Sequence, residues 1–422
     1  MIDLDNSRSI NNQLNYLYNL NRLGIKVGLS HTLKLLEICG NPHKNYRSIH
    51  VAGTNGKGST CAMVAEILIS AGYKVGVYSS PHLVRFNERI KINNVFIKND
   101  EIALFIKNHK NAIEKIETTF FETTTAMAFK HFAENNIDVA VIETGLGGRL
   151  DSTNVISPSI TAITPISLDH REILGPDIET ITKEKGGIIK PETPVVLAKQ
   201  EKVSISILRK ISKTQNSKII YQETPQNIVL SENGTVFEIK SESFKIPLIG
   251  HHQAFNAALS IKIIKQFDPK IKSKVIQKGL DKTIWPARLQ KLLIKPLIFY
   301  DVAHNANGIN AMLNSMTSLY NCSPLGLIVL KSNKEINLIK EATYGKFKLL
   351  IISGSKKHGL LSGTELSKHL SSPKGSNYLV ENSLLKALDA LEEKSAELNV
   401  PGVIFGSHYI AKEVFDKFGF LI

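Results

Sequence analysis

One glycine-rich segment constrains this chain more than any other feature. An apolar run over residues 49–52 is followed by Gly53-Thr54-Asn55-Gly56-Lys57-Gly58-Ser59-Thr60 and then by a helical apolar pattern over residues 61–71. Glycines adopt backbone angles that other residues avoid, so successive N–H groups can turn toward one anion at a helix N-terminus. Lys57 adds a positive charge there. The segment predicts a phosphate-binding loop, although Gly58 separates Lys57 from the Ser59 hydroxyl, which departs from the usual P-loop spacing.

Apolar runs alternate with helical patterns through the first two thirds of the chain. A strand pattern at 73–78 is followed by near-continuous apolar runs at 137–142, 160–166 and 194–198. Buried strands of this kind, separated by helices, predict an α/β fold with a doubly wound, mostly parallel sheet of the P-loop NTPase type. Ligands of such sheets bind at the carboxyl ends of the strands, where the polar clusters of this sequence fall.

The remainder of the chain predicts a second domain. Short alternating segments over 219–246 indicate a small antiparallel addition, and Trp285-Pro286-Ala287-Arg288 then breaks the pattern. A new alternating series follows at 297–300, 325–330, 349–353 and 403–405, without a glycine-rich phosphate loop. We therefore expect an ATP-binding domain over residues 1–286, carrying the antiparallel addition, and a smaller Rossmann-like domain over residues 287–422.

Composition narrows the class of partner. The 422 residues carry a net charge of +14, but the lysines are scattered and there is one Trp, so we expect no nucleic-acid partner and instead anionic small substrates. Three separated cysteines give neither a disulfide framework nor a paired metal-ligand spacing. No apolar run has the length of a membrane span. We expect a cytoplasmic protein that works as a monomer without a membrane partner.

Three strand ends carry candidate metal ligands. Glu143 ends an apolar strand, where a carboxylate either binds Mg²⁺, as an acid in a P-loop protein commonly does, or caps the adjacent glycine-rich turn. His170 ends another strand and is either a further ligand or a satisfied polar residue. Ser80 offers its hydroxyl to the same ion or caps the turn at Pro81. The sequence leaves these alternatives open.

Two residues of the second half are suited to a nucleotide. Arg288 lies at the predicted domain boundary, and Asp301 follows the first strand of the second domain. An arginine can bind phosphate while an aspartate binds ribose or base. The alternative is ordinary pairing at a domain interface.

The ordered set of motifs resembles the Mur ligase superfamily, and more closely its folylpolyglutamate synthase/dihydrofolate synthase family. The resemblance extends from about residue 23 to residue 411. It is carried by these segments: Val51-Ala52-Gly53-Thr54-Asn55-Gly56-Lys57-Gly58-Ser59, Tyr78-Ser79-Ser80-Pro81-His82-Leu83, Asn87-Glu88-Arg89-Ile90, Glu143-Thr144-Gly145-Leu146-Gly147-Gly148-Arg149-Leu150-Asp151-Ser152-Thr153-Asn154, Leu168-Asp169-His170, Glu184-Lys185-Gly186-Gly187-Ile188, His252-Gln253-Ala254-Phe255-Asn256 and Asp301-Val302-Ala303-His304-Asn305.

The resemblance implies a role for each matched residue. Thr54, Asn55, Gly56 and Lys57, with Gly58 and Ser59, would hold the ATP phosphates, and Asn256, Arg288 and Asp301 would also contact ATP. Ser80, Glu143 and His170 would bind two Mg²⁺ ions. Lys185 matches a lysine that the family carbamylates near the second metal. Lys57, Glu143, His170 and Lys185 would be the catalytic set, and Gly28, Leu29, Phe121, Glu122, Leu150 and Asp151 would border the pterin-bearing substrate.

The implied activity is an ATP-dependent amide ligase that adds L-glutamate to dihydropteroate and to reduced folates through an acyl phosphate. The chain departs from the family at Ala287, which replaces a glycine, and at Lys331-Ser332-Asn333-Lys334-Glu335, which matches an Asp-Lys-Asp loop only loosely. Three alternatives stay open: a peptidoglycan Mur-type ligase, a nucleic-acid-dependent NTPase, and a degenerate homologue that binds folate or nucleotide without turnover.

Overall fold

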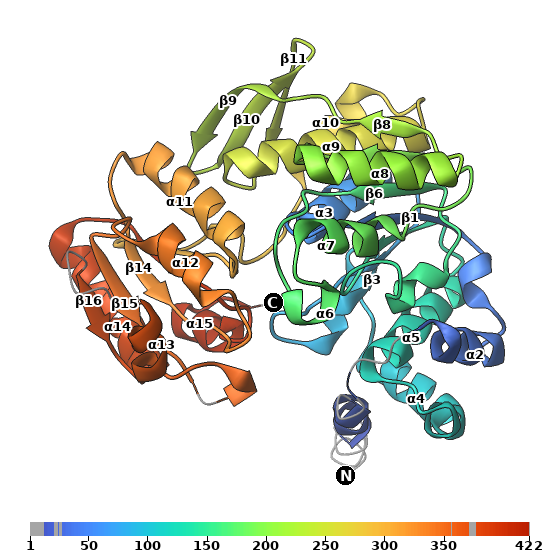
Figure 1. The fold of residues 1–422 in the computed structure, drawn as a ribbon, viewed down its shortest axis with the longest axis horizontal. Coiled ribbons are helices and arrows are strands. Elements are labelled where there is room, and N and C mark those ends of the chain that lie inside the picture. Colours follow the sequence, from blue (N-terminus) through green and yellow to red (C-terminus); the bar gives the residue numbers. More distant parts are fainter. Residues whose placement is uncertain (1–11, 21–23, 25–27, 356, 371–376, 422) are drawn as a thin grey trace. The chain divides into compact units, whose positions relative to one another are not determined.

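The chain folds into two compact units, each with its own sheet (Figure 1). The computed structural model describes residues 12–20, 24, 28–355, 357–370 and 377–421. The first unit holds the described part of Met1–Leu168 together with Leu174–Glu223 and Asn256–Leu280. The second unit holds Asp169–Ile173, Thr224–Phe255 and Asp281–Ile422.

A large sheet organises the first unit. Within the described residues it has eight strands in the spatial order β4-β3-β2-β5-β1-β6-β7-β8. Its strands are β1 (Arg47–Ala52), β2 (Val75–Tyr78), β3 (Ile90–Ile92), β4 (Val95–Phe96), β5 (Val139–Glu143), β6 (Ile160–Ile163), β7 (Val195–Leu197) and β8 (Ile219–Tyr221). In this spatial order, the strands β2, β5, β1, β6, β7 and β8 are paired in parallel. β3 and β4 pair antiparallel and form one edge of the sheet. The central strands are buried except for Arg47 at the start of β1, which explains why apolar residues dominate them.

Helices pack on this sheet and form separate apolar clusters. The helices are α2 (Ser30–Ile38), α3 (Lys57–Ser70), α4 (Asn99–Ile116), α5 (Phe120–Glu134), α7 (Ile178–Gly186), α8 (Lys202–Thr214), α9 (His251–Phe267) and α10 (Ser273–Asp281), with the 3-10 turns η2 (Pro42–Lys44), η3 (Phe86–Arg89) and η4 (Ser152–Val155). Figure 1 shows α2, α4 and α5 side by side; they bury one cluster with Tyr78 and Ile142 of the sheet. A second cluster joins α7 and α8 to Ile163 and Leu197.

The second unit contains two sheets in its described residues. One has six strands in the order β12-β13-β17-β14-β15-β16, parallel except for β12, and the other has three antiparallel strands in the order β11-β10-β9. The strands are β9 (Gln226–Ser231), β10 (Gly234–Ile239), β11 (Glu242–Ile246), β12 (Gln290–Ile294), β13 (Leu297–Tyr300), β14 (Leu325–Ile328), β15 (Leu349–Ile352), β16 (Tyr378–Val380) and β17 (Gly402–Phe405).

Helices of the second unit cover its larger sheet. They are α11 (Ala306–Tyr320), α12 (Ile336–Thr343), α13 (Gly363–Leu370), α14 (Leu384–Leu398) and α15 (Ala411–Phe418), with the 3-10 turn η5 (Lys357–Gly359). The short helix α6 (Arg171–Leu174) begins in residues that cluster with this unit. α11, α12 and α13 bury a core with Phe299, Ile328 and Phe405 of the sheet. This arrangement places the polar residues after β13 and β14 at one edge of a parallel sheet.

The predicted fold class is confirmed: a mostly parallel α/β sheet is accompanied by a second, smaller α/β sheet. One detail differs, since β8 extends the large sheet, and the antiparallel addition is β9 to β11, which clusters with the second unit. The domain boundary at residues 286 and 287 stays a prediction. In the part of the chain that is described, no helix combines the length and apolarity needed to cross a membrane.

Candidate functional site

The predicted phosphate loop joins β1 to α3. β1 ends at Ala52 and α3 begins at Lys57. Gly53 and Gly56 have φ angles of +142° and +89°, which side chains resist. There is also no room for side chains, because an added Cβ would lie 1.9 Å from Thr164 Oγ1 at Gly53 and 2.4 Å from Asn256 Oδ1 at Gly56. The two glycines are therefore required by the loop's conformation and by its close neighbours.

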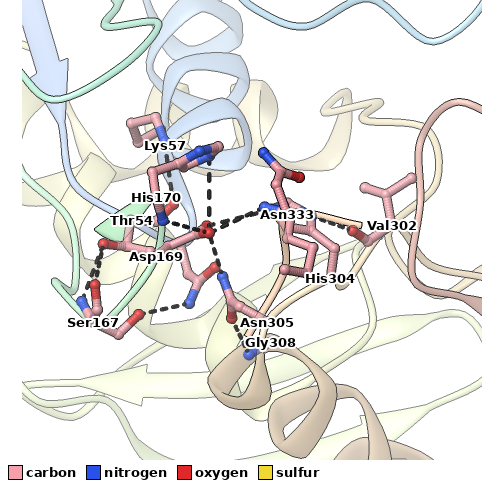
Figure 2. A network of polar contacts seen from close by, with 12 residues as sticks. Thr54, Lys57, Ser167, Asp169, His170, Val302, His304, Asn305, Gly308 and Asn333 are labelled. Carbon is pink, nitrogen blue, oxygen red and sulfur yellow. Dashed lines mark hydrogen bonds and ion pairs between the residues drawn. The ribbon is translucent and has the colours of Figure 1, made fainter. Parts of the chain in front are cut away.

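The first half of the loop is fastened to the segment after β6. The backbone N–H groups of Thr54 and Asn55 both donate to Pro165 O, at 3.0 and 3.3 Å. The Thr54 hydroxyl donates to Ser167 O at 3.1 Å and accepts the Ser167 N–H at 3.1 Å (Figure 2). Backbone donors for an anion therefore come from the first turn of α3 rather than from Thr54 and Asn55, since the first N–H groups of a helix have no intrahelical acceptor.

The first turn of α3 offers hydroxyl groups as well as N–H groups. Ser59 Oγ and Thr60 Oγ1 are buried and make no hydrogen bond with the described part of the chain. A buried hydroxyl without a hydrogen-bond partner costs free energy, so these hydroxyls favour a ligand that can form hydrogen bonds with them. The Lys57 ammonium donates to Thr54 O at 3.2 Å, back across the loop. These groups fit a phosphate with an associated divalent cation.

α9 supports the loop from another direction. Asn256 lies against Gly56, as the glycine contact above shows, and one helical turn later Ser260 Oγ donates to Thr60 O at 3.4 Å. The structure thus brings the predicted ATP residue Asn256 to the phosphate loop, although 200 residues separate the two segments in sequence.

Glu143, Ser80 and Lys185 also lie beside this loop. Glu143 ends β5 in register with Val51 of β1, and its carboxylate is buried. Ser80 N donates to Glu143 Oε2 at 3.3 Å, which brings together two of the predicted metal ligands. Lys185, near the end of α7, is buried and donates to Gly53 O at 2.9 Å. The first unit therefore gathers a carboxylate and two lysines at the carboxyl ends of β1 and β5.

His170 belongs to the other unit and is held by a different set of contacts. Burial lowers the pKa of the His170 imidazole to about 4, so the ring is neutral at pH 7, as a metal ligand must be. Among the described residues, no group of three or more His, Cys, Asp or Glu side chains is placed to hold a metal ion. The predicted ligand set contains two residues of those types, with a serine and a lysine, so its role as a metal site stays a prediction.

Asp169 is a residue that sequence reasoning named only as the neighbour of His170. Burial opposes its ionisation, yet contacts with His304 and Lys334 hold the pKa of its carboxyl group well below the ordinary value. His304 Nε2 lies 3.5 Å from Asp169 Oδ2, and Asn305 Nδ2 donates to the same oxygen at 3.3 Å (Figure 2). In the sequence, the only indication of a role for Asp169 was its position directly before a histidine at a strand end.

Arg288 and Asp301 lie close together in the second unit. Asp301 Oδ2 accepts the Leu289 N–H at 2.9 Å, and Oδ1 accepts the Ala303 N–H at 2.7 Å. Burial raises the pKa of Asp301, while the charge of Arg288 and these two N–H groups act in the opposite direction. Arg288 Nη1 donates to Ala287 O at 3.1 Å. Both predicted ATP residues therefore lie at the same end of the β12–β13 hairpin, Arg288 before β12 and Asp301 after β13.

The residues predicted to border the pterin fall on three neighbouring elements of the first unit, since α2, α5 and η4 contact one another. Gly28 and Leu29 precede α2, Phe121 and Glu122 form the first turn of α5, and Leu150 and Asp151 precede η4. The Phe121 ring lies on Gly145, where a Cβ would approach it to 2.4 Å. Glu122 Oε2 accepts the Thr119 N–H at 2.7 Å, which caps α5.

Beside these elements lies a cluster of aromatic and basic side chains that the sequence did not indicate as part of the site. Arg89 Nε donates to His82 Nδ1 at 2.8 Å, and the Arg89 guanidinium lies 5.2 Å from the centroid of the Phe120 ring, on which Tyr18 stacks at 5.9 Å. Burial lowers the pKa of His82 to about 3, and the charge of Arg89 adds to this. The segments that contain His82 and Arg89 were recognisable, but no spacing rule linked them.

The fold and the phosphate loop are those of a Mur ligase, and the family model described as Mur ligase middle domain matches residues 51–264. The dihydrofolate synthase/folylpolyglutamate synthase of Bacillus subtilis is 36% identical over 342 residues, covering 76% of this chain and 79% of that protein. The folylpolyglutamate synthase of Mycobacterium tuberculosis, solved with ADP and AMPPCP, matches with a TM-score of 0.89, 27% identity and coverage of 98% and 99%.

A third similar protein is FolC of Escherichia coli, solved with DHPP and ADP, with a TM-score of 0.84, 27% identity and coverage of 96% of this chain and 97% of that chain. The chain belongs to the folylpolyglutamate synthase/dihydrofolate synthase family of Mur ligases. It is an ATP-dependent glutamate ligase that uses Mg²⁺, and the predictions of class and cofactors are confirmed. The peptidoglycan alternative is not supported.

Proposed function

We propose that the protein joins L-glutamate to the free carboxyl group of dihydropteroate, and to that of a reduced folate, through an acyl phosphate. The substrate carboxylate attacks the γ-phosphorus of ATP and ADP leaves. The glutamate amine, having lost a proton, then attacks the acyl carbon and phosphate leaves. Phosphorylation is needed because a free carboxylate would have to expel oxide.

The observation that carries this proposal is the loop between β1 and α3. At the start of one helix, two glycines that tolerate no side chain and a lysine meet two buried hydroxyls that have no hydrogen-bond partner among the described residues. In the proposed reaction, the N–H groups of the first turn bind phosphate oxygens, and the Lys57 ammonium stabilises the negative charge on the transferred group. Asn256 holds the loop in the conformation that presents these donors.

Glu143 and Ser80 are the residues of the first unit that would hold Mg²⁺, and we propose His170 as a further ligand. Bound Mg²⁺ neutralises charge on the triphosphate and on the transferred phosphoryl group. The fit rests on the buried Glu143 carboxylate beside Ser80 and on the unpartnered Ser59 hydroxyl in the same unit.

We also propose that Lys185 carries a carbamate. Its side-chain nitrogen is buried beside Gly53 O. Loss of one proton from the ammonium gives the amine, which attacks CO₂ and loses a second proton, so the cation would become a carboxylate-like carbamate. Incubation with ¹³C-bicarbonate should give a carbamate signal in ¹³C NMR that Lys185→Arg abolishes. A spectrum identical for both proteins would refute the modification without affecting the ligase proposal.

Arg288 and Asp301 are proposed to contact ATP, with Arg288 on phosphate and Asp301 on ribose or base. The residues around the starts of α2, α5 and η4 are proposed to bind the pterin. The Phe121 ring supplies an aromatic face there, and Glu122 and Asp151 supply carboxylates.

Purified protein with ATP, Mg²⁺ and L-glutamate tests the proposal when dihydropteroate or a reduced folate is added. We expect ADP release that requires both acceptor and glutamate, and mass spectrometry should detect the glutamylated product. Glu143→Gln should lower turnover at least about 100-fold while folate still shifts the melting temperature. ADP release that needs neither acceptor nor glutamate, or that nucleic acid stimulates, would contradict it.

We further propose that the enzyme works as a monomer in the cytoplasm. The described cysteines are free thiols, as a reducing compartment favours. Light scattering should give a mass near 46.7 kDa, and a value twice as large would overturn the monomer.

A further inference from the structure

The segment that contains His170 has an unusual backbone. It follows β6 in sequence, yet residues 169–173 cluster with the second unit. His170 has φ of +54°, a left-handed conformation that is unfavourable for a residue with a side chain. Asp169 Oδ1 accepts the His170 N–H at 3.0 Å, and the Ile173 N–H donates to His170 O at 3.0 Å. The surrounding contacts must therefore hold His170 in this conformation.

Three consecutive residues after β14 contact the residues on both sides of His170. Lys334 Nζ lies 3.0 Å from Asp169 Oδ1, and both side chains are about nine-tenths buried, at 10% and 11% exposed. Glu335 Oε2 lies 3.3 Å from Arg171 Nη1. Asn333 Nδ2 donates to Glu172 Oε1 at 3.2 Å. We call residues 333–335 the grip.

The other oxygen of Asp169 is fixed from the start of α11. Asn305 donates to Asp169 Oδ2 through Nδ2, while its own Oδ1 accepts the Gly308 N–H at 2.9 Å and caps the helix. His304 Nδ1 lies 2.9 Å from Val302 O, which orients the ring whose Nε2 faces Asp169 (Figure 2). Asp169 is thus held on both oxygens by residues that the rest of the second unit positions.

We propose that Asn333, Lys334 and Glu335 position His170, by fixing Glu172, Asp169 and Arg171 so that the left-handed backbone aims the imidazole. This inference rests on the proposed role of His170 as a metal ligand. The identity of residue 333 is consistent with this role, because an amide there donates to Glu172 and an aspartate would repel that carboxylate.

A metal-binding measurement tests the grip without turnover. Mn²⁺ replaces Mg²⁺ as the probe, and electron paramagnetic resonance measures free Mn²⁺ in the presence of saturating AMPPCP. Lys334→Met should raise the Mn²⁺ dissociation constant about tenfold, the usual effect of removing a group that orients a metal ligand. Lys334→Arg should stay within about threefold of the parent protein, and Lys346→Met, on an exposed lysine of the same unit, should change nothing.

Two further variants separate positioning from a general loss of structure. Asn333→Asp should weaken Mn²⁺ binding about threefold with an unchanged melting temperature. Arg171→Glu and Glu335→Arg should each weaken it by a similar factor, and the double variant should recover the parent affinity, because the ion pair is restored with its charges exchanged.

The outcomes are distinguishable from failure of the proposed metal site. If His170→Ala leaves Mn²⁺ affinity unchanged, then His170 is no ligand and the proposed function loses that assignment. If His170→Ala weakens binding while Lys334→Met and the single charge reversals do not, then the metal site stands and the grip is refuted. A double charge exchange that fails to restore affinity would also refute it.

Discussion

The carboxylate of Asp301, just after β13, accepts the backbone N–H of Leu289 at 2.9 Å and so closes the turn that carries Arg288. The same carboxylate accepts the Ala303 N–H at 2.7 Å through its other oxygen. A residue predicted to touch ATP is therefore also the centre of a buried backbone network. Its two roles can be separated by experiment.

Asp301→Asn should lower the free energy of unfolding by about 1–3 kcal/mol. One carboxylate oxygen becomes an NH₂ group, which faces a backbone N–H donor and leaves it unsatisfied. Urea denaturation measures the change, and a titration with ADP measures nucleotide affinity separately. Unaltered stability would show that the turn does not depend on the carboxylate.

Ala287→Gly should raise the free energy of unfolding by about 0.5–1 kcal/mol. Ala287 has φ of +57°, where a Cβ costs about 1–2 kcal/mol, and the greater backbone entropy of glycine offsets part of the gain. The glycine expected by family resemblance thus has a physical reason. Ala311→Gly, inside α11, is the matched control and should lose about 1 kcal/mol. Destabilisation by both substitutions would contradict the prediction.

Gly56→Ala should reduce ADP affinity at least about tenfold, because the methyl group would meet Asn256 Oδ1 at 2.4 Å and displace the loop. Gly72→Ala is the control at the opposite end of α3. It has a similar φ of +95° with nothing within 4 Å of the added Cβ. Both variants should lose stability from backbone strain, but isothermal titration should find weaker ADP binding in Gly56→Ala alone.

His50 gives the protein a pH-dependent stability. Burial lowers the pKa of its imidazole from 6.5 to about 3, and the charge of Lys190 contributes. Between these pH values the unfolded chain binds a proton that the folded chain does not. Above about pH 6.5 the imidazole is neutral in both states, and the titration of His50 does not change the free energy of unfolding. As the pH falls below this value, the free energy of unfolding decreases by about 1.4 kcal/mol per pH unit.

His50→Gln should reduce this slope by about that amount between pH 6 and pH 4.5. Glutamine does not titrate, and it can still reach the Thr153 hydroxyl that His50 Nε2 contacts at 2.8 Å. Urea denaturation at several pH values measures the slope for each protein. Parallel curves for the two proteins would show that His50 does not titrate as inferred.

The sequence by itself determined the fold class and the phosphate loop. Unbroken apolar runs such as residues 139–142 indicate strands buried on both faces, and glycines beside Lys57 indicate an anion site, because both signals are local. Local order also placed Glu143 at a strand end.

Only the tertiary structure decided which distant residues meet. The packing of Asn256 on Gly56, the contact of Lys185 with Gly53 O and the contact of Lys334 with Asp169 each join segments more than 100 residues apart. It also showed that the backbone N–H groups of Thr54 and Asn55 donate hydrogen bonds to Pro165 O. The periodicity of apolar residues in the sequence does not specify such pairings, because they depend on how whole elements pack. Packing determines which polar groups are removed from water and therefore need a hydrogen-bond partner.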